Sequence, residues 1–108
     1  MGLIFGVAVN DMVGSSVDSD SKEYLLWNAM LSRCFSRYTK KVRPTYEGVT
    51  CCAKWLTFSK FLEDVRSMVG YERCIGKGWV LDKDILVKGN KLYSKETCCF
   101  VPKEIKKK

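Results

Sequence analysis

The 108-residue sequence contains no histidine, so it lacks the side chain that enzymes use most often as a general base or metal ligand near neutral pH. It has no apolar run of the length needed to cross a membrane. The apolar start, residues 1–9, carries no basic segment, and it predicts a short strand over residues 3–9 in place of a signal peptide. We therefore expect a cytoplasmic protein without a membrane partner.

Cysteine pairs of the usual zinc-binding type, with two residues between them, are also absent. Two pairs are directly adjacent, at 51–52 and 98–99, and neighbouring side chains of a strand point to opposite faces of a sheet. Each pair is therefore badly placed to bind one metal ion. We predict reduced, mostly buried thiols and no metal site, with a zinc site and a disulfide framework as alternatives. The six cysteines are Cys34, Cys51, Cys52, Cys74, Cys98 and Cys99.

The composition is that of a folded globular protein, with 46% apolar and 12% aromatic residues, and the length predicts a single domain, residues 1–108. Charge is distributed unevenly along the chain. Residues 1–23 carry four acidic residues and one lysine, whereas the remainder has 18 basic and 8 acidic residues, a net charge of +10. A basic body favours a polyanion such as nucleic acid as the partner, the alternative being a protein that is basic by chance.

Two helices are predicted from the spacing of apolar residues. Over residues 22–35, apolar side chains recur at three- and four-residue intervals, and the serines at 19–21 can cap the first turn. A second helix is expected to begin after Thr57, which caps it, and to end at Gly70. Short strands are expected at residues 49–52 and 79–86.

Five basic residues and no acidic residue fall between positions 33 and 43. Basic residues suit the C-terminal end of a helix dipole, but five of them exceed what the dipole requires. We therefore interpret them as phosphate contacts, with an exposed helix end as the alternative. Tyr38, Tyr46 and Tyr93 are interleaved with cations and are candidates for stacking on bases. The five basic residues are Arg33, Arg37, Lys40, Lys41 and Arg43.

The last third of the chain predicts a hairpin, a turn and a short capped helix. Residues 79–86 read WVLDKDIL, the turn at 88–91 reads KGNK, and residues 93–102 read YSKETCCFVP. Three further segments precede these in the same order: LWNAMLSRC at 26–34, GVTC at 48–51 and WLTFSKFL at 55–62. This succession resembles small phage proteins of the HNH nuclease type over residues 24–104.

Together with the predicted elements, the resemblance implies an α+β fold. Two main helices are expected to pack on a small antiparallel sheet, and the chain is expected to end in a ββα hairpin-helix unit of the HNH type. The chain then divides into an N-terminal strand and acidic loop (1–23), an HNH-like body (24–104) and a basic tail (105–108).

The family's Asp-His pair, in which the histidine is the base, falls on Asp82 and Lys83, so the module is expected to be degenerate. The carboxylates of Asp82 and Asp84 favour the charged form of the lysine between them, which binds phosphate but accepts no proton from water. We therefore expect Lys83, together with Lys88 and Lys91 of the same hairpin, to contact duplex DNA.

Three functions remain as hypotheses. The first is a phage-derived protein that binds duplex DNA through a basic surface in a bacterial host cell, without catalysis or cofactor. The second is a DNA endonuclease in which Asp82, Lys83 and Asp84 act with Mg²⁺ or Mn²⁺. The third is a phage accessory or anti-defence protein that binds and inhibits a host protein, with the acidic loop 14–21 as its docking segment.

Overall fold

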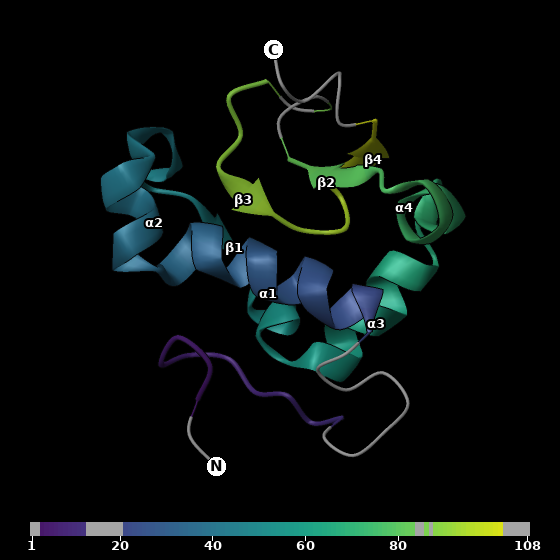
Figure 1. The fold of residues 1–108 in the computed structure, drawn as a ribbon, viewed down its shortest axis with the longest axis horizontal. Coiled ribbons are helices and arrows are strands. Elements are labelled where there is room, and N and C mark those ends of the chain that lie inside the picture. The colour runs from purple at the N-terminus through teal and green to yellow at the C-terminus, as the bar shows by residue number, and fades with distance from the viewer. Residues whose placement is uncertain (1–2, 13–20, 84–85, 87, 103–108) are drawn as a thin grey trace.

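The computed structural model describes residues 3–12, 21–83, 86 and 88–102. Helices and short strands alternate in an α+β arrangement, and α1 crosses the middle of the molecule between the strands and the N-terminal segment (Figure 1). The elements follow in the order α1 (Lys22–Phe35), α2 (Arg37–Val42), the 3-10 helix η1 (Pro44–Tyr46), β1 (Thr50–Cys51), the 3-10 helix η2 (Ala53–Leu56), α3 (Phe58–Arg66), α4 (Tyr71–Lys77), β2 (Val80–Asp82), β3 (Leu92–Tyr93) and β4 (Cys99–Val101).

The predicted helix over residues 22–35 is confirmed as α1. Its first turn is capped by Ser21, whose Oγ accepts a hydrogen bond from the backbone N–H of Tyr24 at 3.0 Å. The residues at helical spacing, Trp27, Leu31 and Cys34, are all buried. The apolar periodicity therefore identified the face that α1 presents to the core.

Two tryptophans connect α1, η2 and α3 within this core. The Trp27 ring stacks on Phe58 with centroids 4.8 Å apart, and its Nε1–H donates to the carbonyl oxygen of Trp55 at 2.7 Å. The Nε1–H of Trp55 donates in turn to the Asp64 carboxylate at 2.8 Å. Because both indoles are fully buried, these bonds avoid the cost of an unpaired donor, about 1–3 kcal/mol each.

The second predicted helix begins where expected but ends earlier. α3 starts after Thr57, whose side chain makes no capping hydrogen bond, and it ends at Arg66. The Ser67 hydroxyl donates to the Asp64 carbonyl oxygen at 2.8 Å, an alternative to continuing the helical ladder. Gly70, with φ of +91°, lies in the turn before α4, which the sequence pattern did not predict.

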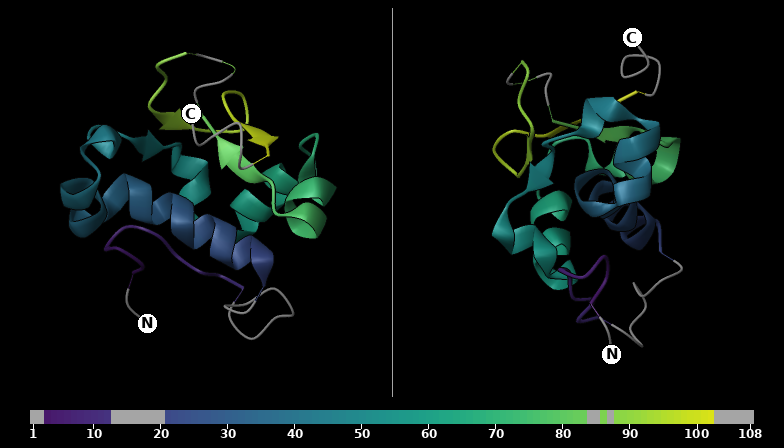
Figure 2. Two further views of the ribbon diagram at one scale, coloured as in Figure 1. Left: turned by 45° about the horizontal axis from the view of Figure 1, so that its top comes forward. Right: turned by 90° about the vertical axis from the view of Figure 1, so that its left-hand side faces the viewer.

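The expected ββα unit is wrong for the described residues. β2 pairs antiparallel with β4, Leu81 opposite Phe100, while β3 pairs parallel with β1 (Figure 2). Residues 95–97 form a turn where a helix was expected, and the hydroxyls of Ser94 and Thr97 lie 2.7 Å apart across it. Local hydrogen bonds between side chains of this kind favour a turn over a helix. After this turn the chain continues as β4, which pairs with β2.

The strand expected over residues 3–9 is also wrong. Residues 5–7 form a turn, closed by an isolated bridge between Ile4 and Ala8. Val9 then bridges Thr57 at the start of α3. The acidic loop 14–21, apart from Ser21, and the basic tail 105–108 lie outside the described residues. Within the described part, no helix has the length and apolar character required to cross a bilayer.

Candidate nucleic-acid interface

The basic segment 33–43 is divided between two helices. Ser36 interrupts the helix after Phe35, and its Oγ accepts a hydrogen bond from the backbone N–H of Thr39 at 3.2 Å, which caps α2. Arg37 and Lys41 are exposed on this short helix, which buries none of its residues. The sequence signal that would have found α2 is Ser36 followed three residues later by Thr39. In the structure, the Thr39 hydroxyl also lies 2.7 Å from the hydroxyl of Ser32.

Arg33 and Lys83, fifty positions apart in the sequence, converge on Tyr93. The Arg33 guanidinium donates to the Tyr93 hydroxyl at 3.5 Å and lies 6.0 Å from the centroid of the Tyr46 ring. Lys83 Nζ lies 5.8 Å from the centroid of the Tyr93 ring, within the range of a cation–π contact. The structure thus brings one cation from α1 and one from the end of β2 to the same aromatic side chain.

Tyr93 supports these cations but cannot stack on a base, because it is fully buried. Burial raises the pKa of Tyr93 to about 12, while the neighbouring Arg33 favours the phenolate and limits the rise. The phenol is therefore neutral at physiological pH and does not cancel the charge of either cation. Tyr38, at 75% exposure, keeps the stacking role open for α2.

Lys40 and Lys91 meet on the backbone of residues 47–49. Lys40 Nζ donates to the carbonyl oxygen of Val49 at 3.2 Å, and Lys91 Nζ donates to that of Glu47 at 3.1 Å. Gly48, with φ of +81°, lies between them. Both contacts therefore fall on the residues that lead into β1, beside the β1–β3 ladder, and Figure 1 shows α2 and β3 in the left-hand half of the molecule.

None of the eight predicted DNA-contacting cations forms an ion pair with another described residue. The ion pairs among the described residues are Lys54–Asp64, between η2 and α3, and Arg66–Glu23, between α3 and the first turn of α1. Arg43 and Lys88 are exposed, like the two cations of α2. The structure therefore brings four of the eight, Arg33, Lys40, Lys83 and Lys91, into contact with β3 or with the residues that lead into β1. None of the eight has a carboxylate partner among the described residues.

Two of the three residues of the endonuclease hypothesis lie in the described part of the chain. Asp82 is only 5% exposed at the end of β2, opposite Cys99 of β4. Lys83 faces Tyr93, and Asp84 lies outside the described residues. Within the described ranges, no three side chains of the metal-binding types lie close enough to hold one ion. The buried position of Asp82 follows from the pairing of β2 with β4, which the sequence did not reveal.

Five cysteines with described side chains are free thiols, three buried and two half-buried. The Cys34 thiol contacts the Met30 sulfur at 3.7 Å and lies beside Cys51. The hydrogen bond with Cys51, together with burial, raises the pKa of Cys34, and burial raises the pKa of Cys98 to about 11. Cys34 and Cys98 are therefore protonated at neutral pH and pack as small apolar side chains, whereas the hydrogen bond with Cys34 lowers the pKa of Cys51.

The chain matches no protein-family model, no curated protein and no solved structure.

Proposed function

We propose that this protein binds duplex DNA without sequence readout, through a surface that we call the basic face. The basic face contacts phosphates of both strands, and the protein acts as a DNA-binding accessory protein of phage origin without catalysing a reaction. Its members are Arg33, Arg37, Lys40, Lys41, Arg43, Lys83, Lys88 and Lys91.

The observation that carries the proposal is the meeting of two basic segments across the β1–β3 ladder. Cations from residues 33–43 and from residues 83–91 share Tyr93 and the backbone of residues 47–49 as anchoring points. Because these contacts hold the charged groups themselves, less entropy is lost when such a cation binds phosphate. Because none of these cations has a carboxylate partner among the described residues, phosphate binding breaks no ion pair there.

Fluorescence anisotropy with a labelled 20-base-pair duplex over a series of salt concentrations tests the proposal. Each phosphate contact contributes about −0.9 to the slope of log affinity against log salt, so five contacts give a slope of roughly −4 to −5. Arg37→Gln combined with Lys41→Gln removes two exposed cations of α2 and should reduce the magnitude of the slope by about two.

The matched control removes two exposed cations from other helices. Lys60 lies on α3 and Lys77 at the end of α4, both exposed and outside the basic face. Lys60→Gln combined with Lys77→Gln changes the net charge equally but should leave the slope nearly unchanged. No binding at low salt, or an equal loss of slope in both double variants, contradicts a localised basic face.

A further inference from the structure

Two cysteines that are distant in the sequence lie beside each other between α1 and β1. Cys34 belongs to the last turn of α1, and Cys51 is the second residue of β1. Both side chains are buried in the same core cluster, and a hydrogen bond joins the two thiols. Because α1 packs on β1, it is the tertiary fold that brings these sulfur atoms together.

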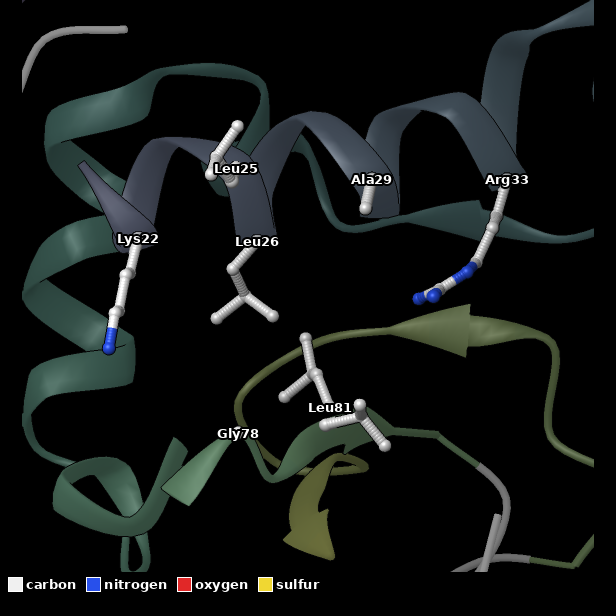
Figure 3. Close-up of a pocket in the computed structure, with 8 residues that line it drawn as sticks. Lys22, Leu25, Leu26, Ala29, Arg33, Gly78 and Leu81 are labelled. Carbon is white, nitrogen blue, oxygen red and sulfur yellow. The ribbon is translucent and has the colours of Figure 1, made fainter. Parts of the chain in front are cut away.

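Contacts of the neighbouring residues hold the two elements in this arrangement. Figure 3 shows the side chain of Arg33, the residue before Cys34, directed from the last turn of α1 toward the strands. Its guanidinium donates to the Tyr93 hydroxyl at 3.5 Å. Tyr93 is the residue that pairs with Cys51 in the β1–β3 ladder. The residue beside one thiol therefore contacts the residue paired with the other, which places α1 against β1 independently of the sulfur contact.

The two thiols differ in acidity and in exposure. The hydrogen bond with Cys34 lowers the pKa of Cys51, although burial opposes this. The same hydrogen bond, together with burial, raises the pKa of Cys34. Cys51 is also the more exposed of the two, at 8% against 3%. Since the thiolate is the form that attacks an oxidant, Cys51 is the nucleophile of the pair and Cys34 is the thiol beside it that can complete a disulfide.

We propose that Cys34 and Cys51 are an oxidant-sensitive thiol pair, which hydrogen peroxide converts to a disulfide and a dithiol reductant restores. Cys51 Sγ attacks one peroxide oxygen, the O–O bond breaks, and a sulfenic acid forms on Cys51 as one water molecule leaves. Cys34 Sγ then displaces the hydroxyl group from the Cys51 sulfur, so that the S–S bond forms, the S–O bond breaks and a second water molecule leaves. The two sulfurs are oxidised and the peroxide is reduced.

Cys52 provides the natural comparison for this assignment. It is half-buried, and so more exposed than its neighbour Cys51, but burial raises its pKa. If exposure alone decided the reaction, Cys52 would react before Cys51. The arrangement of the pair predicts the reverse order. The proposed bond is a covalent modification of the chain itself, and it does not rest on the DNA binding proposed above.

Titration of thiols before and after oxidation tests the proposal. Reduced wild type is treated with hydrogen peroxide while folded, then freed of oxidant and unfolded for the titration. The count should fall by two, from six to four, and dithiothreitol should restore it. An unchanged count overturns the proposal, as does a loss that dithiothreitol does not reverse.

Peptide mapping without reductant identifies the bond. Trypsin releases Cys34 in the peptide 34–37, and it releases Cys51 together with Cys52 in the peptide 42–54, because the bond between Arg43 and Pro44 resists cleavage. These two peptides should be linked in the oxidised protein and separate after reduction.

Matched variants decide between the two neighbouring cysteines. Cys52→Ala leaves one cysteine in each peptide, so it should still form the linked pair and should fall from five thiols to three. Cys51→Ala also retains five thiols but should form no linked pair of these peptides. A bond that persists in Cys51→Ala, or one between any other two cysteines in oxidised wild type, overturns the proposal.

Discussion

Removing the Asp64 carboxylate should destabilise the fold far more than removing the charge alone. Asp64 is 6% exposed and accepts hydrogen bonds from Trp55 Nε1–H and from Lys54 Nζ, each at 2.8 Å. Asp64→Ala leaves the fully buried indole N–H without an acceptor, which costs about 1–3 kcal/mol. The lost ion pair adds about 0–1 kcal/mol, since the Lys54 side chain is 46% exposed. We expect a total loss of about 1–4 kcal/mol in the free energy of unfolding.

Asp64→Asn separates the two contributions. The amide oxygen can still accept from Trp55, so this variant should lose only about 0.5–1 kcal/mol in urea-induced unfolding. Glu63→Ala is the matched control, because it removes an exposed carboxylate from the neighbouring position of α3 and should have little effect. Equal losses for Asp64→Ala and Asp64→Asn would refute the argument from the buried indole.

The pH dependence provides an independent check. Burial alone would raise the pKa of Asp64, but hydrogen bonds from Lys54 and Trp55 outweigh it and hold the pKa below its usual range. A carboxyl whose folded pKa is lowered stabilises the protein above its unfolded pKa, about 3.9, and this stabilisation is lost as pH falls through the folded value. The difference in stability between wild type and Asp64→Asn should therefore be constant from about pH 5 to 7 and shrink below about pH 4.

Three further outcomes are expected. Gly70→Ala should destabilise the protein by roughly 1–2 kcal/mol, because φ is +91° and a Cβ would meet that of Phe100 at 3.3 Å. Gly76→Ala in α4, where a Cβ has no neighbour within 4 Å, should stabilise it by about 0.5–1 kcal/mol. Urea-induced unfolding of both variants measures these differences. Thiol titration of unfolded protein without reductant should count six thiols, and bound zinc or a lower count contradicts the free-thiol assignment. Wild type should leave supercoiled plasmid intact in Mg²⁺ or Mn²⁺, since Asp82 is 5% exposed; nicking that Asp82→Asn abolishes would restore the endonuclease hypothesis.

The parts of the fold that the sequence predicted well are those determined locally. In α1 and α3 the apolar residues repeat at helical spacing, and Ser21 marks the first helix with a side-chain cap. Both helices therefore begin at the predicted residue. α2 and α4 have six and seven residues, too few for the periodicity to separate them from loop.

Strand pairing could not be read in the same way, because it depends on distant residues. The parallel pair joins Thr50 to Leu92, and strands of two or three residues carry too little alternation to specify a partner. The sequence therefore suggested the nearest pairing, a hairpin within residues 79–93. The actual pairing of β2 with β4 places Asp82 in the interior, which changes the interpretation of the endonuclease residues.

The candidate DNA contacts illustrate the same distinction. The clustering of Arg37 and Lys41 was visible in the sequence because both lie on one short segment. The meeting of Arg33 with Lys83 was not, because it requires β3 to bring Tyr93 between them. Charge composition thus predicts a polyanionic partner, while tertiary structure determines which cations lie close enough to act together.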